Sequence, residues 1–518
     1  MKKILLLSSL LFVVGCSNKF EPIKPEIITD PTELSNRMTQ VNQDVSMITV
    51  DPLVTTVPKF THISTISAPT ITTISGVKQL KATATLKLDN YLYIAYNYDG
   101  PEVYGGLDIV NIQHLASPVL VASIRSSVYE FNDIKARGRA LYLAGNKKDV
   151  GAAVVIMDIA NTMSPVIVNE LLVPGDVATS LDIRNGEMQI SSGLNGGISR
   201  YEVAWTDVLT PTFIRYNPFP NALFVKTMFD PYQPGQNIPE PLILGGAGDT
   251  HLYWMDKELP LNSLSNTAPT RLAVSGPMVY MNMTNGGLKV TDISKLYDGR
   301  GFEGFVSTLN LPGQGTGIAQ LDQKLYVARG GAGVRYISVD EPGAPQEIGY
   351  LAFNDVTSVN NVWIERYAWT FKVLTVVDGE GGVRLVVEDT SKLKYPGSWI
   401  QIYAKGTPLA GINPLMEVSV NGSVVATNIS VASHTWSIYH VNTPAPIPFG
   451  ADVKIRFYND AWIPGVDDRN LSIGYVKIGD DYYYPWWNNL LKTDGSPMIP
   501  VDSDNLQLYS NGYMQIYR

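Results

Sequence analysis

Cysteine, histidine and charge are scarce in this sequence, and each scarcity excludes a class of protein. One cysteine in 518 residues excludes a disulfide framework. The five histidines show no metal-ligand spacing such as His-Glu-x-x-His, and neither a Gly-x-Ser-x-Gly nor a phosphate-loop motif occurs. Charged residues make up 17%, with a formal net charge of -9. This argues against nucleic acid as a partner, because phosphate binding needs clustered Lys and Arg.

Only the N-terminus carries a long apolar run. Two lysines precede an apolar stretch at residues 4–14, which is too short to span a bilayer and indicates a targeting segment. The stretch ends in Val13-Val14-Gly15-Cys16, which resembles the lipobox of bacterial lipoproteins. The resemblance implies that residues 1–16 are a signal peptide and that Cys16 carries the lipid. The alternative is a plain secretory signal with an incidental cysteine.

The residue after the cysteine bears on location. In Gram-negative lipoproteins a Ser at this position, here Ser17, implies transfer to the outer membrane. We therefore expect an outer-membrane lipoprotein, facing the periplasm or the outside, that is held to the membrane by its lipid. Residues 17–75 are polar and punctuated by prolines, which favours a stalk. The alternation at residues 62–66 also fits a strand that completes the following domain.

What the chain has in abundance is turn formers and aromatic residues. It contains 44 Gly, 33 Pro and 28 Tyr, and few charges separate its many aromatic and β-branched residues. This composition is typical of an all-β protein, and a chain of this length can form two or three domains.

A repeat runs through residues 76–392. Its unit is a Leu-Tyr-hydrophobic-Ala strand, a Gly-rich turn and a second apolar strand; the first of these strands recurs at 92–95, 141–144 and 325–328. The turns recur about every 45 residues, which suits four-stranded propeller blades, and seven units close a ring. The apolar strands, Leu107-Asp108-Ile109-Val110-Asn111 and Val154-Val155-Ile156-Met157-Asp158, resemble those of the LVIVD-repeat β-propellers. We interpret the acidic Asp158 as a turn-capping residue.

The last part, residues 394–518, reads as a β-sandwich of jelly-roll type. Strand-like runs flank a tight Asn421-Gly422 hairpin turn. Four short motifs follow one another: Ala-x-Gly-Thr from residue 404, Met-Glu-Val from 416, a strand ending in Asn-Asp at 460, and Asp-Arg-Asn-Leu from 468. This series resembles the calcium-dependent xylan-binding family of carbohydrate-binding modules.

A strand end and one loop bring Asp460, Asp467 and Asp468 together, and carboxylates are ligands that calcium prefers. The resemblance implies a calcium ion whose open coordination positions take vicinal sugar hydroxyls. It carries the ligand role to Asp460 and to Asp467 or Asp468, with Glu417 as a further candidate. It also implies that Asp460 and Asp468 contact carbohydrate, and Trp462 has an aromatic face suited to a sugar ring.

Two plainer interpretations of this loop remain. Calcium can be purely structural, or the two adjacent acids can be turn formers with Arg469 paired to an acid of the sandwich. Ile463 also stands where the family often has an acid, so the ligand set is open. The aromatic run at residues 482–487 is either a glycan platform or packs onto the module or the propeller.

The function these parts predict is polysaccharide binding by a calcium-dependent module, with the propeller as scaffold or as docking domain for a protein partner. Two alternatives stay open. One is a glycan-degrading enzyme with its active site on the propeller face, and the other is a structural component of an envelope or matrix assembly.

Overall fold

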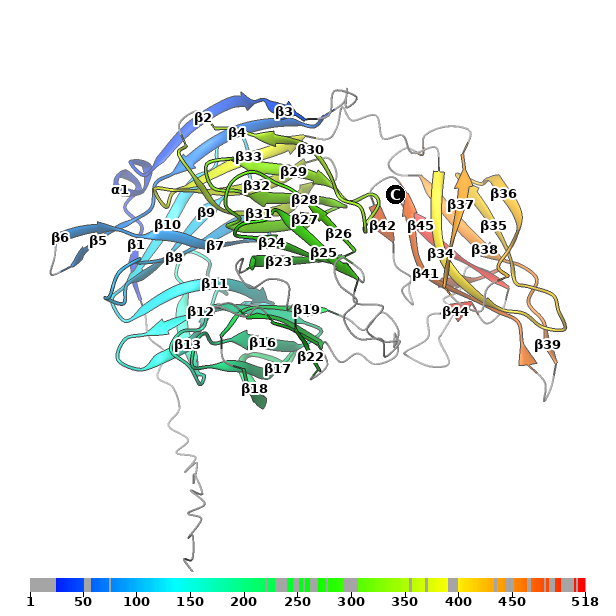
Figure 1. Ribbon diagram of the computed structural model, residues 1–518, viewed down its shortest axis with the longest axis horizontal. Coiled ribbons are helices and arrows are strands. Elements are labelled where there is room, and N and C mark those ends of the chain that lie inside the picture. Colours follow the sequence, from blue (N-terminus) through cyan, green and yellow to red (C-terminus); the bar gives the residue numbers. More distant parts are fainter. Residues whose placement is uncertain are drawn as a thin grey trace, which may run out of the picture.

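A computed structural model shows two all-β parts (Figure 1). It describes residues 25–50, 57–73, 76–219, 221–228, 240–245, 251–254, 257–260, 269–275, 278–292, 306–353, 356–368, 371–389, 399–432, 436–443, 447, 451–463, 467–478, 481–483, 490–494, 507–508 and 511–517. Cys16, the predicted lipidation site, lies outside these residues.

Within the described residues, the first part contains seven antiparallel sheets of four or five strands. Sheets 1 to 3 contain β7 (Lys81–Leu88), β8 (Tyr91–Asn97), β9 (Gly105–Asn111) and β10 (Val119–Ser126); β11 (Tyr129–Arg137), β12 (Ala140–Lys147), β13 (Gly151–Asp158) and β14 (Val166–Leu172); and β15 (Ser180–Arg184), β16 (Glu187–Ser191), β17 (Gly197–Ala204) and β18 (Asp207–Pro218). Sheets 4 and 5 contain β19 (Ala222–Met228), β20 (Glu240–Gly245), β21 (His251–Trp254) and β22 (Lys257–Pro260); and β23 (Pro269–Ser275), β24 (Met278–Met283), β25 (Leu288–Asp292) and β26 (Ser307–Leu309).

The last two sheets recruit strands from the N-terminal segment. Sheet 6 contains β27 (Gly317–Leu321), β28 (Lys324–Ala328), β29 (Val334–Ser338) and β30 (Gln346–Leu351), extended by β3 (Met47–Thr49). Sheet 7 contains β31 (Val359–Ala368), β32 (Phe371–Asp378) and β33 (Val383–Asp389), completed by β4 (Lys59–Ile66) and β2 (Met38–Val45). The first strands of successive sheets contact one another around the ring, and β31 contacts β7. The sheets therefore close into a β-propeller, as the repeat predicts.

The expectation of a stalk at residues 17–75 is wrong from residue 26 onward. In the register of sheet 7, His62 pairs with Val386 and Ile66 pairs with Val383. Alternate residues of β4 are buried, so this strand fills the outer part of the sheet and joins the N-terminal segment to the last strands of the ring. Sheet 1 likewise gains β1 (Glu26–Ile28) beside β10. Only a short hairpin, β5 (Thr70–Thr73) and β6 (Gly76–Gln79), separates β4 from the first sheet.

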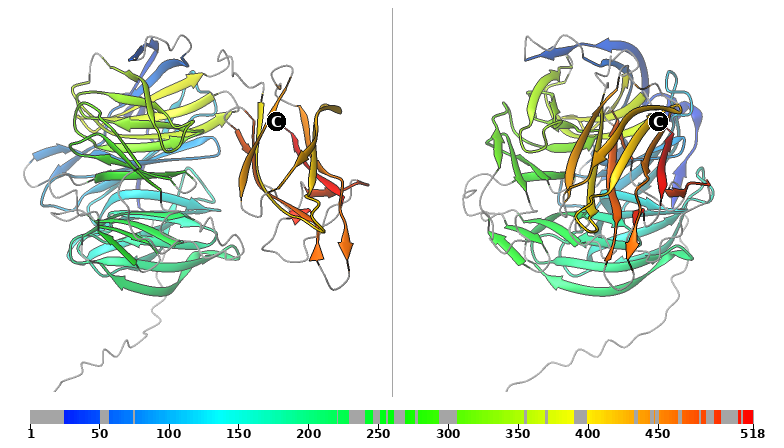
Figure 2. Two further views of the ribbon diagram at one scale, coloured as in Figure 1. Left: turned by 45° about the vertical axis from the view of Figure 1, so that its right-hand side comes forward. Right: turned by 90° about the vertical axis from the view of Figure 1, so that its right-hand side faces the viewer.

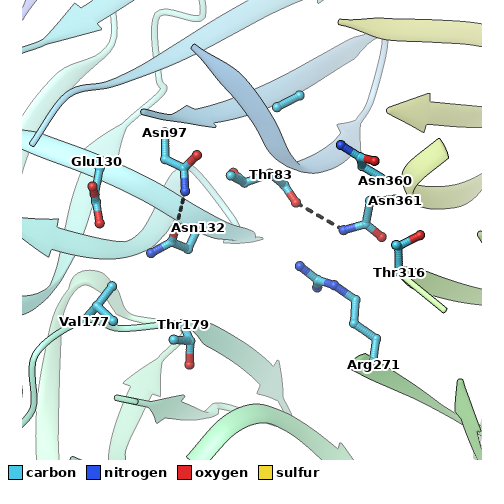
Figure 3. Close-up of a pocket in the computed structure, with 11 residues that line it drawn as sticks. Thr83, Asn97, Glu130, Asn132, Val177, Thr179, Arg271, Thr316, Asn360 and Asn361 are labelled. Carbon is cyan, nitrogen blue, oxygen red and sulfur yellow. Dashed lines mark hydrogen bonds between the residues drawn. The ribbon is translucent and has the colours of Figure 1, made fainter. Parts of the chain in front are cut away.

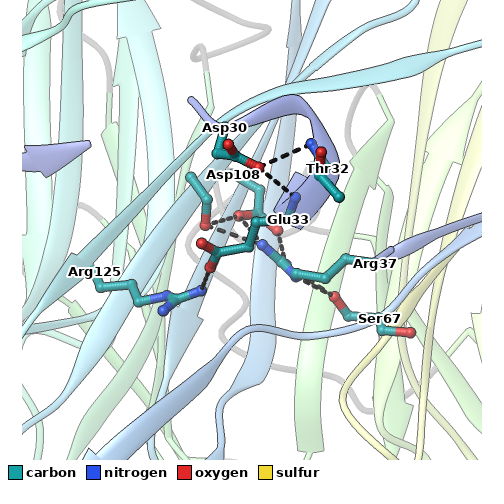
Figure 4. A network of polar contacts seen from close by, with 8 residues as sticks. Asp30, Thr32, Glu33, Arg37, Ser67, Asp108 and Arg125 are labelled. Carbon is teal, nitrogen blue, oxygen red and sulfur yellow. Dashed lines mark hydrogen bonds and ion pairs between the residues drawn. The ribbon is translucent and has the colours of Figure 1, made fainter. Parts of the chain in front are cut away.

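A helix and a buried ion pair fasten the N-terminal segment to sheet 1 (Figure 4). The helix α1 (Pro31–Ser35) begins at Asp30, whose side chain accepts hydrogen bonds from the backbone N–H groups of Thr32 and Glu33. Just after the helix, Arg37 pairs with Asp108, whose side chain is fully buried in β9. Arg37 also donates to the Ser67 carbonyl at 2.9 Å. We refer to α1, Arg37 and Asp108 as the N-terminal clasp.

The repeated tyrosine explains why the sheets pack as they do. It lies in the second strand of its sheet and is almost fully buried at positions 93, 142 and 326. Its hydroxyl crosses to another sheet: Tyr93 bonds to Thr162, Tyr142 donates to the Val208 carbonyl, and Tyr326 donates to Glu388. The motif therefore places one polar tie at each of these sheet interfaces. Asp158 caps its turn by accepting from the Ala160 N–H at 2.9 Å, as predicted.

The second part is a β-sandwich. One sheet has the order β37 (Ser437–Asn442), β34 (Trp399–Thr407), β41 (Asn470–Ile478) and β42 (Asp481–Tyr483), with β44 (Gln507–Leu508) beside β41. The other has the order β36 (Ser423–Ser430), β35 (Leu415–Val420), β38 (Asp452–Phe457), β45 (Gly512–Tyr517) and β43 (Leu490–Lys492). One apolar core lies between them, formed by residues such as Ile402, Phe457 and Val476. Both residues of the predicted Asn421-Gly422 turn have positive φ, as such a hairpin requires.

The sandwich lies against one face of the ring (Figures 1 and 2). Lys477 of β41 donates a hydrogen bond to the side chain of Gln323, in the turn that ends β27. Lys477 and Gln323 are both buried, and each residue is only 3% exposed. The contact places the sandwich at the end of the ring where the innermost strands finish.

Candidate functional site

The predicted calcium loop is a small hairpin at the tip of the sandwich. Strand β39 (Trp462–Ile463) pairs with β40 (Asp467–Asp468), with Trp462 opposite Asp468. The ladder continues toward the sandwich, because the Arg469 N–H donates to the Ala461 carbonyl at 2.9 Å. Extending this register by one step places Asp460 opposite Asn470.

Side chains alternate between the two faces of a hairpin, so paired residues two steps apart share a face. Asp460, Asn470, Trp462 and Asp468 therefore lie on one face of this hairpin. The side-chain oxygens Oδ1 of Asp460 and Asn470 are buried and accept no hydrogen bond within the described residues. Buried acceptors normally find a donor, so two such oxygens on one face indicate a place for a cation.

The electrostatics of Asp460 agree with this. Burial raises the pKa of Asp460 above its ordinary value, and the neighbouring Asp468 carboxylate raises it further. The Ala461 N–H and the Arg469 charge act in the opposite direction without cancelling the shift. Both burial and the neighbouring carboxylate thus disfavour the charged form of Asp460, and the oxygen donors present fit a hard cation such as calcium.

Arg469 fixes the base of the hairpin. Its guanidinium donates to three main-chain carbonyls, those of Leu409 at 3.3 Å, Ile412 at 3.0 Å and Asn459 at 2.5 Å. Arg469 is only 7% exposed, and its cross-strand partner in the hairpin is Ala461. Arg469 therefore ties the 409–412 turn to the hairpin through backbone carbonyls, where the alternative interpretation expected pairing with an acid.

Asn459 organises the same corner and has no role in the sequence-based prediction. Its side-chain oxygen accepts from the Leu415 N–H at 2.6 Å, and its side-chain nitrogen donates to the Asn413 carbonyl at 2.8 Å. The Asp460 N–H in turn donates to the Asn511 side chain at 3.0 Å. Short amide side chains at strand ends commonly bond to nearby backbone in this way, so the Asn-Asp pair in the sequence could have indicated the role of Asn459.

Trp462 stands out from the module. Its residue is 68% exposed, and the following Ile463 is 40% exposed. An indole held by a hairpin and open to solvent offers its face to an apolar surface. Because Trp462 shares its face with Asp460 and Asp468, a ligand that contacts the carboxylates also reaches the indole.

Two other predicted ligands are placed differently. Glu417 lies in β35 opposite Arg456, and the two side chains form an ion pair at 3.5 Å. Asp467 pairs with Ile463 in the hairpin, and its side chain lies outside the described residues. Within the described part of the chain, no three His, Cys, Asp or Glu side chains gather as a metal cluster. The structure thus brings Asp460 and Asp468 together and leaves the roles of Glu417 and Asp467 as predictions.

A second aromatic group lies on the outer side of β34 and β41. The Tyr403 ring stacks on Trp436 and on Tyr475, with ring centroids 5.0 Å apart in both pairs. Gly474 makes this possible, since a Cβ there would lie 2.8 Å from the Tyr403 ring. In the aromatic tail, Tyr483 packs on the sandwich core, while residues 484–487 lie outside the described residues.

Residues 399–486 match the family described as Ca-dependent carbohydrate-binding module, xylan-binding (CBM60). The matched residues include the whole hairpin and the strands that support it. The match therefore supports carbohydrate binding by the sandwich. No curated protein sequence matches the chain.

Several solved structures resemble the ring. The WD40 β-propeller domain of Doa1 is 14% identical and has a TM-score of 0.39, covering 63% of this chain and 97% of that one. The computationally designed protein Ika8 is 14% identical, with a TM-score of 0.38 and coverages of 62% and 98%. Sqt1 from Saccharomyces cerevisiae is 8% identical, with a TM-score of 0.42 and coverages of 60% and 96%. These likenesses are too distant to bear on function.

Proposed function

We propose that the protein is an outer-membrane lipoprotein that binds xylan-like polysaccharide through its calcium-dependent sandwich, with the propeller as scaffold or docking domain for a protein partner. The observation that carries the proposal is the shared hairpin face of Asp460, Asp468, Asn470 and Trp462, inside the segment that matches the xylan-binding family.

The residues of this face divide the work. The carboxylates of Asp460 and Asp468 and the amide oxygen of Asn470 supply oxygen donors for calcium. Bound calcium would offer open coordination positions to a pair of vicinal sugar hydroxyls. Trp462 presents its ring to the apolar C–H side of the sugar. The Arg469 guanidinium holds the hairpin in place by donating hydrogen bonds to main-chain carbonyls. Glu417 and Asp467 remain candidate ligands.

Calorimetric titration of the full chain, first with calcium and then with soluble xylan, tests the proposal. We expect xylan binding with calcium and none with EDTA, and loss of both calcium and xylan binding in the double variant Asp460→Ala with Asp468→Ala. Asp452→Asn is the matched control, because Asp452 belongs to the same sandwich but pairs with Lys454. Unchanged xylan binding in the double variant would contradict the proposal.

Trp462→Ala separates the aromatic contact from the metal site. The exposed indole lies outside the sandwich core, so we expect normal calcium binding and a roughly tenfold loss of xylan affinity, equivalent to about 1.4 kcal/mol. Loss of calcium binding in this variant would show that the indole supports the hairpin instead of the ligand.

The membrane attachment rests on the residues around Cys16. Metabolic labelling with a radioactive fatty acid in a Gram-negative host should mark the protein and place it in the outer-membrane fraction. Cys16→Ser should remove both the label and the membrane association. Among the described residues, no helix is long and apolar enough to cross a bilayer.

A further inference from the structure

A cavity of about 440 Å³ lies on the axis of the ring (Figure 3). It is lined at the starts of the innermost strands, by residues such as Thr83, Glu130, Asn132, Arg271, Thr316 and Asn361. The sandwich contacts the ring at Gln323, where β27 ends, whereas Thr316 precedes β27. The cavity therefore belongs to the end of the ring away from the sandwich contact, and its size is that of a small-molecule site.

Most polar groups of the cavity wall serve the ring itself. The side chains of successive innermost strands donate to backbone carbonyls of the next sheet: Thr83 to Phe131 at 2.7 Å, Asn132 to Ala178 at 3.2 Å, Thr179 to Ala222 at 3.3 Å, Thr316 to Val359 at 2.8 Å, and Asn361 to Thr83 at 3.4 Å. These donors are committed to the fold and are not available to a ligand.

Four groups of the wall are not used in this way. The amide nitrogen of Asn360 and the amide oxygen of Asn97 make no hydrogen bond within the described residues, although the other end of each amide does. The Glu130 carboxyl also lacks a hydrogen-bond partner there. The fourth group is the guanidinium of Arg271, which Figure 3 shows pointing into the cavity.

Arg271 is held by aromatic rings and not by an acid. Its guanidinium carbon lies 5.5 Å from the ring centroid of Phe224 and 5.8 Å from that of Trp363. Asp133 acts on it electrostatically. That carboxylate, however, already accepts from Lys135, from Ser180 and from the Leu181 N–H, each at 3.0 Å. No hydrogen bond or ion pair of Arg271 appears among the described residues, so its N–H edges remain for a ligand.

We propose that this cavity binds a uronic acid, as a free sugar acid or as the end residue of an acidic saccharide. A planar guanidinium with free N–H groups matches a carboxylate in bidentate fashion. The free amide groups of Asn97 and Asn360 supply both an acceptor and a donor, as sugar hydroxyls require. Among the described residues that line the cavity, Arg271 is the one cation and Glu130 the one acid, so a single negative charge fits better than a phosphate dianion. This site is separate from the calcium face in position and in chemistry.

Titration of the full chain with D-glucuronate and with D-glucose, both in EDTA, tests this site apart from the module. We expect glucuronate to bind at least tenfold more tightly than glucose. Arg271→Gln should weaken glucuronate binding at least tenfold. Arg139→Gln should not, because its side chain is 58% exposed and pairs with Asp158 at the edge of sheet 2.

A second variant guards against misfolding. Asn360→Asp places a like charge on the wall of the cavity without changing its size, and it should weaken glucuronate binding while sparing the circular dichroism spectrum. Equal affinities for glucuronate and glucose, or glucuronate binding unaffected by both variants, would overturn the proposal. Acetate that competes as well as glucuronate would overturn the sugar assignment. Binding lost in the Asp460→Ala, Asp468→Ala protein would place the acid at the module instead.

Discussion

Charged side chains in this protein are few, and the buried pair of Arg37 and Asp108 holds the N-terminal segment to the ring. The Asp108 carboxylate is fully buried, and among the described residues Arg37 is the one side-chain cation bonded to it. Burying a carboxylate is costly unless a partner compensates it, so the clasp depends on both residues. The strand motif that contains Asp108 is thus also the docking point of the N-terminal segment.

Arg37→Met should therefore destabilise the ring by about 3–5 kcal/mol, because it leaves Asp108 buried without its cation. Lys59→Gln serves as control, since the Lys59–Asp44 pair is solvent-exposed and should cost less than about 1 kcal/mol. Thermal unfolding followed by calorimetry measures both. A small effect of Arg37→Met, equal to that of the control, would show that Asp108 is satisfied without the clasp.

Glu130 makes stability depend on pH. Burial raises the pKa of Glu130 to about 7, so between about pH 4.5 and pH 7 the folded chain keeps a proton that the unfolded chain has released. The unfolding free energy should therefore fall as pH rises through this window. Glu130→Gln should leave stability near pH 4.5 unchanged and raise it at pH 8 by about 2 kcal/mol, measured by urea denaturation. The same difference at both pH values would contradict the assignment.

At the scale of the elements, the repeated Leu-Tyr strand shows how local sequence specifies packing. Its Tyr hydroxyl reaches a neighbouring sheet, and its apolar neighbours fill the space between sheets. In the three sheets that contain it, the sequence pattern therefore predicts more than a strand, because it marks the strand whose tyrosine bonds to the next sheet.

Tyr142→Phe tests this tie. Removing the hydroxyl leaves the buried Val208 carbonyl without its donor, and we expect a loss of about 1–2 kcal/mol in unfolding free energy. Tyr91→Phe is a suitable control, because Tyr91 is only partly buried and no hydrogen bond of its hydroxyl appears within the described residues. Equal effects of the two changes would mean that Tyr142 contributes only through its ring.

Features that depend on local motifs can be predicted from this sequence, and features that depend on ring closure cannot. The propeller, the sandwich and the Asp460–Asp468 neighbourhood follow from local motifs, since each motif lies within a hairpin or a short loop. The cavity does not, because Glu130, Arg271 and Asn360 come from three sheets and meet only when the ring closes. Aligning the repeats on the starts of their first strands would have shown polar residues at these positions.

The assignment of residues 17–75 failed for a related reason. Prolines and polar residues in this segment resemble a linker, but β2 and β4 lie at the outer side of a sheet, where β2 is largely exposed and prolines can stand between strands. The partner of β4 on its other side lies more than three hundred positions away: His62 pairs with Val386. No local pattern identifies such a partner.

At the scale of the whole molecule, the N-terminal segment and sheet 7 form one closure. A chain that begins at residue 67 would lack β1 to β4 and leave the edge of β33 unpaired. We expect it to self-associate through this edge or to aggregate, whereas a chain that begins at residue 25 should stay monomeric. Light scattering after gel filtration distinguishes them. A monomeric truncated chain with the full unfolding temperature would show that β4 is dispensable.

The closure by β4 also sets a timetable for synthesis. Residues 59–66 emerge from the ribosome early, but their partner β33 ends at residue 389, so the first strand of the closed ring waits for most of the chain. During this interval β4 can pair with β2, but its other edge has no partner and is prone to wrong association. Pairings of such long sequence separation also form slowly. A nascent chain of this design therefore exposes one edge of β4 until its last blade has been made.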